Sequence, residues 1–160
     1  MERVNRILRH PRYADCLKQV RDCENGRIFC RHQMEHFLDV ARIAYILNLE
    51  EGRGLAKDMI YAAALLHDCG RYVQYTDGTP HEEASSAIAP GILKDCGFVS
   101  REIEEITEAI SAHRDRSRAE KHALSDVIYR ADKASRACFS CTAQKQCDWK
   151  AARKNMEIRY

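Results

Sequence analysis

Hydrophobic residues recur along this chain at the three- and four-residue spacing of amphipathic helices, and alternating strand patterns are scarce. This spacing predicts about seven helices. The first covers roughly Arg3 to Arg9 and meets Pro11, and the second carries an apolar face that ends at Asn25 and Gly26. Few prolines and glycines interrupt the pattern. The sequence therefore predicts an all-α fold, a single-domain helical bundle.

The third and fourth predicted helices place histidine and aspartate beside their apolar stripes. The third begins near Arg31, and His36 lies on its stripe, so we expect this side chain to point inward. The fourth covers Leu55–Cys69 and carries His67 and Asp68 at its end. A histidine next to a carboxylate at a helix end is a suitable pair of metal ligands.

A loop over Arg71–Gly78 precedes the fifth predicted helix. Thr79, Pro80 and Glu82 fit a capping box, with Thr79 as the N-cap and Pro80 at the first helical position. His81, which follows Pro80, would then lie in the first turn of this helix.

The last two predicted helices repeat the pattern. The sixth starts after Ser100, and His113 continues its apolar stripe at the C-terminal end. The seventh covers about Glu120–Cys138, with Asp132 beside its stripe. A short helix is expected after Trp149.

Length, charge and hydropathy indicate the number of domains and the kind of partner to expect. A chain of 160 residues is most simply one domain over 1–160, with a core at roughly 30–138 and a cysteine-containing extension at 138–160. The net charge of +2 gives no argument for nucleic-acid or membrane binding. The longest apolar stretch, Met59–Leu66, is too short to cross a bilayer, and the charged N-terminus does not resemble a leader. We therefore expect a cytoplasmic protein whose eight cysteines are thiols or metal ligands, with its oligomeric state open.

Six histidines and aspartates form the candidate site. A single histidine on an apolar face is more often a hydrogen-bonded core residue, and Asp132 alone could pair with Arg136. Together, however, several buried ionisable groups are costly unless they are paired or bind a metal, and one metal centre would account for all of them. The predicted ligands are His36, His67, Asp68, His81, His113 and Asp132.

The order and local context of these residues resemble the HD-domain superfamily of metal-dependent phosphohydrolases. The matching contexts are Glu35–Ala41, Leu65–Arg71 and Arg130–Lys133, and the resemblance spans roughly residues 30–138. It implies an all-helical bundle of five or more helices. It also implies that His36, His67, Asp68 and Asp132 hold one metal, and that Asp68 bridges to a second held by His81 and His113.

The resemblance further implies a hydrolase that attacks a phosphomonoester or a nucleotide phosphoanhydride with a metal-activated hydroxide. The cofactors would be one or two divalent transition metals, with Fe and Mn favoured over Zn, Co, Ni or Mg. The partner would be a small phosphorylated substrate such as a nucleotide, held by Arg71 and Lys133, with Arg114 and Arg136 as weaker candidates. Two alternatives remain open: a di-iron oxygenase with the same ligands, and a non-catalytic nucleotide-binding regulatory module.

A second metal motif overlaps the first. Residues 32–36 read H-x-x-E-H, the signature of inverzincin peptidases, in which Glu104 or Glu105 would have to be the third ligand. This alternative leaves His67, Asp68 and Asp132 without a role, so it is the weaker hypothesis.

The cysteines are a separate matter. Cys16 and Cys23 fit core packing on the second helix. The spacing of Cys138, Cys141 and Cys147 resembles three-quarters of a structural zinc or iron–sulfur site, for which Cys30 or Cys23 could supply a fourth ligand. Buried thiols or a redox pair are the competing interpretations.

Overall fold

A computed structural model describes all 160 residues and contains nine α-helices, two short 3₁₀ helices and no strand. The prediction of an all-α fold is confirmed. The α-helices are α1 (Glu2–Arg9), α2 (Pro11–Cys23), α3 (Met34–Glu50), α4 (Lys57–Leu66), α5 (Arg71–Thr76), α6 (His81–Asp95), α7 (Ser100–Ala112), α8 (Arg116–Ala119) and α9 (Ala123–Ala134), and the 3₁₀ helices are η1 (Cys138–Ser140) and η2 (Ala151–Arg153).

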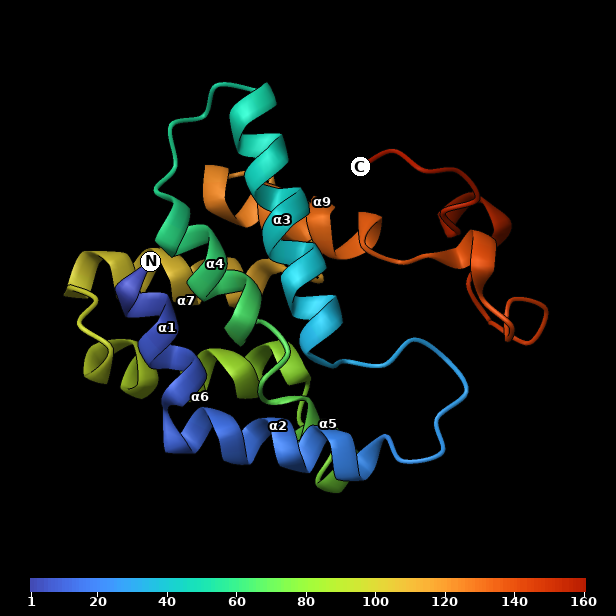
Figure 1. Cartoon of the computed structure of the whole chain (residues 1–160), viewed down its shortest axis with the longest axis horizontal. Coiled ribbons are helices and arrows are strands. Elements are labelled where there is room, and N and C mark those ends of the chain that lie inside the picture. The colour runs from blue at the N-terminus through green and yellow to red at the C-terminus, as the bar shows by residue number, and fades with distance from the viewer.

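Helix α4 lies at the centre of the bundle. It packs against α3 on one side and α7 on another, and α9 contacts all three (Figure 1). Every residue from Ala62 to Leu66 is buried, because a helix surrounded by other helices must be apolar on all sides. The three consecutive alanines keep this helix thin. The end of α4, where His67 and Asp68 follow, is therefore held deep inside the molecule.

The remaining elements cover this centre. Helix α6 packs along α7, α1 contacts α2 and α4, and α2 lies against the short α5. Arg3 of α1 joins three elements, since its guanidinium lies 2.5 Å from Asp58 of α4 and 2.5 Å from Glu102 of α7, above the ring of Phe98. The C-terminal segment after α9 extends from one end of the bundle (Figure 1).

Several element boundaries differ from the sequence-based expectation. Arg71–Thr76, expected to be a loop, forms the helix α5, which is too short to show a periodicity and buries no residue completely. The fourth and seventh predicted helices are shorter, because turns take over at His67 and before Ala123. The terminal helix after Trp149 is one 3₁₀ turn.

The expected capping box is also different. Thr79 does not cap α6, because its own N–H bonds to the side chain of Asp77 in a turn, and the N-cap position falls to Pro80. His81 is nevertheless in the first turn, as expected.

No helix of this fold is long and apolar enough to pass through a bilayer.

Candidate metal centre

The six predicted ligands come from five separate elements and meet in the interior of the bundle. Each of them is buried, at 9% exposure or less. Their ligand atoms fall into two groups of three, and within each group the atoms lie within 4.8 Å of one another. The first group is His36, His67 and Asp132, and the second is Asp68, His81 and His113.

Asp68 joins the two groups through its two carboxylate oxygens. Oδ2 lies 3.2 Å from Nε2 of His67 and 3.7 Å from Nε2 of His36. Oδ1 faces the other way and lies 3.0 Å from Nε2 of His81 and 3.7 Å from Nε2 of His113. On the first side, Asp132 Oδ1 lies 3.4 Å from Nε2 of His36. The geometry is that of two adjacent ligand clusters with one shared carboxylate.

The outer nitrogens of the four imidazoles have oxygen acceptors. Nδ1 of His67 lies 2.7 Å from the carbonyl oxygen of Ala64, and Nδ1 of His113 lies 2.5 Å from that of Ile110. Because a carbonyl oxygen can only accept, each Nδ1 carries the proton and each Nε2 presents a lone pair to the centre.

The other two rings are held by side chains. Nδ1 of His81 lies 2.5 Å from Oε1 of Gln74. Nδ1 of His36 lies 3.2 Å from Oγ of Ser135, which donates its own proton to the carbonyl of Asp132. All four rings are thus oriented as metal ligands usually are, with the distal nitrogen fixed by a hydrogen bond.

Several inward-facing atoms have no hydrogen-bond partner within the protein. They are Nε2 of His36, Nε2 of His67 and Oδ1 of Asp68, all fully buried. Leaving such atoms unpaired is costly, and a divalent ion would satisfy them together. The donor set of imidazole and carboxylate suits first-row transition metals, so these residues fit the metal site that the family pattern implies.

The two buried carboxylates of Asp68 and Asp132 are stabilised by positive charge next to them. Burial by itself would lower the pKa of His67, but the carboxylates of Asp68 and Asp132 outweigh it and raise the pKa to about 10. Burial would raise the pKa of both aspartates, yet the surrounding imidazoles hold each pKa well below its usual range. Without a metal, a proton on an imidazole supplies the charge that the carboxylates require.

The predicted substrate-binding cations lie at the rim of this centre. A cavity of about 550 Å³, the histidine–aspartate pocket, opens onto Asp68 and Asp132 and is lined by Arg71, Lys133 and Arg136. Lys133 Nζ lies 2.5 Å from Asp132 Oδ2, and Arg136 Nη2 lies 3.2 Å from Asp132 Oδ1.

Arg71 reaches the other aspartate, with Nη1 3.9 Å from Asp68 Oδ1. Cations therefore flank both carboxylates within the histidine–aspartate pocket.

A fifth histidine, His32, belongs to this site, and sequence reasoning considered it only as part of a peptidase motif. His32 is buried, its Nδ1 bonds to the carboxylate of Glu24, and its Nε2 lies 3.7 Å from Asp68 Oδ2. Burial lowers the pKa of His32 to about 4, so the ring is neutral at pH 7. It shares the orientation of the other four, with Nε2 turned to the centre. The only available signal was the spacing of four residues from His36.

The peptidase alternative does not fit this arrangement. His32 precedes the start of α3 at Met34, so the motif does not lie on one helix. Glu35, which would be the general base, is exposed, as are Glu104 and Glu105 on α7.

The three C-terminal cysteines differ in burial, since Cys138 is buried whereas Cys141 and Cys147 are half-buried. Cys138, Cys141 and Cys147 do not form a group with mutual distances within 4.8 Å, so a zinc or iron–sulfur site there stays a prediction. Cys138 and Cys147 line the histidine–aspartate pocket together with Cys30. Cys16 is buried as expected, but Cys23 is exposed because it is the last residue of α2, where the helix leaves the core.

Comparison with known proteins identifies the family and gives the same fold. Residues 34–137 match the model of the HD domain. An uncharacterized protein of Clostridium beijerinckii is 45% identical over 160 residues, which is the full length of both chains. A crystal structure described as a predicted HD superfamily hydrolase, from an uncultured Thermotogales bacterium, superposes with a TM-score of 0.63 and 23% identity, covering 91% of this chain and 83% of that one.

Proposed function

This chain belongs to the HD domain family, and from that premise we propose that it is a metal-dependent phosphohydrolase. The substrate would be a small phosphomonoester or a nucleotide phosphoanhydride. The observation that carries the proposal is the position of Asp68, whose two oxygens face two separate histidine groups. The structural neighbour, described as a predicted HD superfamily hydrolase, supports a hydrolytic reaction.

The buried histidines and aspartates would bind the metal ions. His36, His67 and Asp132 would hold one ion, His81 and His113 would hold another, and Asp68 would contact both. When bound, divalent ions lower the pKa of their bound water to about 7 and attract the oxygens of a phosphoryl group. The fixed Nδ1 hydrogen bonds keep the imidazoles from reorienting while the substrate enters.

The rim cations would hold the substrate. Arg71 is 17% exposed in its side chain and Lys133 is 37% exposed, so both reach from the wall of the pocket toward solvent. A guanidinium can bind two phosphoryl oxygens at once, whereas an ammonium acts as a point charge. Together they would orient a phosphoryl group over the ligand centre.

The metals proposed for this site are Fe or Mn. Mixed imidazole and carboxylate ligands suit both ions, whereas a structural zinc site usually contains cysteine. All the ligand atoms in the two groups are nitrogen or oxygen.

The test is a panel of phosphomonoesters and nucleotides assayed with added Mn²⁺ or Fe²⁺. We expect turnover of at least one member and its loss in Asp68→Asn. The matched control is Glu35→Gln, an exposed carboxylate next to His36 in the sequence, which should keep full activity. A metal-loaded protein inactive on every member would contradict the proposal, and so would loss of activity in Glu35→Gln, which the peptidase alternative requires.

A further inference from the structure

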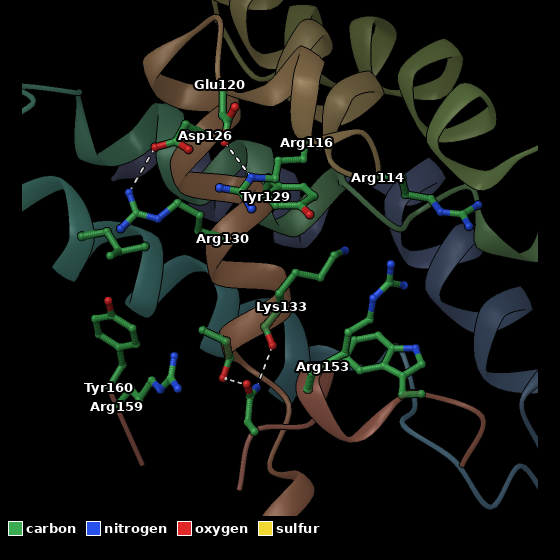
Figure 2. Close-up of a pocket in the computed structure, with 15 residues that line it drawn as sticks. Arg114, Arg116, Glu120, Asp126, Tyr129, Arg130, Lys133, Arg153, Arg159 and Tyr160 are labelled. Atoms are coloured by element: carbon green, nitrogen blue, oxygen red, sulfur yellow. Dashed lines mark hydrogen bonds and ion pairs between the residues drawn. The ribbon is translucent and has the colours of Figure 1, made fainter. Parts of the chain in front are cut away.

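A second cavity adjoins the histidine–aspartate pocket and has a different character. It has a volume of about 670 Å³ and is formed by the α7–α8 connection, by α9 and by the C-terminal segment. The two cavities share three wall residues, Arg114, Lys133 and Trp149. We call it the arginine cavity, after the residues that Figure 2 shows around it.

The wall of the arginine cavity concentrates positive charge. Six cationic side chains line it against only two carboxylates, in a chain whose net charge is only +2. These residues come from three separate segments between residues 114 and 159, and the fold brings the segments together around one cavity. The six are Arg114, Arg116, Arg130, Lys133, Arg153 and Arg159.

Most of these cations already have a partner. Arg130 lies 2.5 Å from Glu51 and 3.1 Å from Asp126, and Arg116 lies 2.7 Å from Glu120. Lys133 pairs with Asp132 of the ligand centre, and Arg114 lies 3.4 Å from Glu82.

Two cations have none. Arg153 and Arg159 make no ion pair and no side-chain hydrogen bond, although both line the cavity. In the view of Figure 2, Lys133 lies between them. The C-terminal segment thus brings two uncompensated guanidinium groups to a cavity that adjoins the histidine–aspartate pocket.

This chemistry selects the ligand. A planar guanidinium binds phosphate oxygens in pairs, and neighbouring cations that repel each other gain when an anion lies between them. The aromatic rings of Tyr129, Trp149 and Tyr160 complete the wall and can cover an apolar part of the same ligand.

We propose that the arginine cavity binds a phosphoryl group other than the one that lies at the histidine–aspartate centre. This proposal rests on the proposed function in one respect. The phosphoryl group in the arginine cavity is called the second because the first would be hydrolysed at the histidine–aspartate centre. It implies a preference for anions that carry several phosphates over simple monoesters. The same chemistry has two sources, the remote phosphate of the substrate itself and a separate polyphosphate, and the mode of inhibition by a polyphosphate distinguishes them.

The experiment uses the full-length, metal-loaded chain and inorganic tripolyphosphate as the probe. Trp149 is the only tryptophan and lines both cavities, so its fluorescence reports binding without any turnover. The variant is Arg153→Gln with Arg159→Gln, both exposed side chains whose loss leaves the core intact. The charge-matched control is Arg9→Gln with Arg101→Gln, on the exposed surfaces of α1 and α7.

We expect the double variant to bind tripolyphosphate about 10-fold more weakly, as the loss of charge-assisted hydrogen bonds predicts, and the control to bind it like the wild type. The KM for p-nitrophenyl phosphate, which has one phosphoryl group, should not change. Competitive inhibition by tripolyphosphate assigns the site to the substrate's remote phosphate, and non-competitive inhibition assigns it to a separate anion.

Equal binding by wild type and double variant would overturn the proposal. If no substrate is turned over, the fluorescence titration still decides it, so failure of the hydrolase function and failure of this site give different results.

Discussion

The backbone N–H of Gly70 donates a hydrogen bond of 2.9 Å to Oγ of Ser85, and no side chain fits between the two residues. A Cβ at Gly70 would meet the carbonyl carbon of Ala84 at 2.6 Å and the Ala84 side chain at 2.9 Å. This contact joins the turn that carries His67 and Asp68 to α6, which carries His81. Gly70, two residues after Asp68, therefore sets how closely α6 and its ligand His81 approach the turn that carries His67 and Asp68.

The substitution Gly70→Ala should destabilise the fold by about 2 kcal/mol, because overpacking forces α6 away from the turn. It should also weaken metal binding by the second group. Chemical unfolding and metal content measure the two effects. Gly91→Ala is the control within α6, where a new Cβ meets nothing closer than 3.6 Å. If Gly70→Ala is as stable as Gly91→Ala, the backbone of Gly70 does not lie as close to Ala84 as the structure shows.

The Ser135 hydroxyl fixes the ring of His36, so Ser135→Ala should lower the metal affinity of the first group about 10-fold, as loss of an outer hydrogen bond to a ligand does. Competition with a chromophoric chelator measures this affinity. Ser86→Ala, which removes a similar hydroxyl-to-carbonyl bond on the exposed side of α6, should leave it unchanged. Equal affinities in the two variants would exclude an orienting role for Ser135.

Glu24 should make the stability of the metal-free protein depend on pH. Burial by itself would raise the pKa of Glu24, but the hydrogen bonds from His32 and Tyr75 outweigh it and lower the pKa to about 2, from 4.5. A pKa lowered on folding adds stability above the unfolded-state value, and this stability is lost as the pH falls from 4.5 toward 2.

Glu24→Gln should therefore be less stable than the wild type by about 2 kcal/mol at pH 7, and the difference should shrink toward zero near pH 2. Urea unfolding at several pH values measures it. Glu2→Gln, at an exposed carboxylate, is the control. A difference that stays constant over the acid range would mean that the pKa of Glu24 is not lowered in the folded state.

Arg71 lies at the rim of the pocket, so Arg71→Gln should raise the KM for a phosphomonoester about 10-fold and change kcat less, because a charged hydrogen bond to the bound substrate is lost. Steady-state kinetics measures both constants. Arg42→Gln removes an exposed arginine of α3 that lies beside Asp39, and it should behave like the wild type. A fall in kcat with an unchanged KM would place Arg71 in the chemical step instead.

Periodicity was enough to predict the main helices, because His36, His67 and His113 lie on or directly after apolar stripes that the core requires. It failed where local structure depends on tertiary contacts. Helix α5 has only six residues, too few to show a periodicity, and it is held by its contacts with α2 and α6.

The six predicted ligands could be chosen from sequence because their motifs are local pairs or helix positions. His32 could not be placed in the site, since its partners Glu24 and Asp68 lie in other segments. The arginine cavity could not be predicted from sequence either. Arg153 and Arg159 have no distinguishing motif, and only the fold brings them to one cavity with residues of α9.

The most direct test of the central claim is the metal content of protein purified without chelator, compared with His81→Ala and with His36→Ala. Two ligand groups that share Asp68 predict two ions per chain in the wild type. Each variant should lose the ion of its own group, and Asp68→Asn should lose both. A wild-type chain that binds no divalent ion, or variants that keep the full complement, would contradict the account.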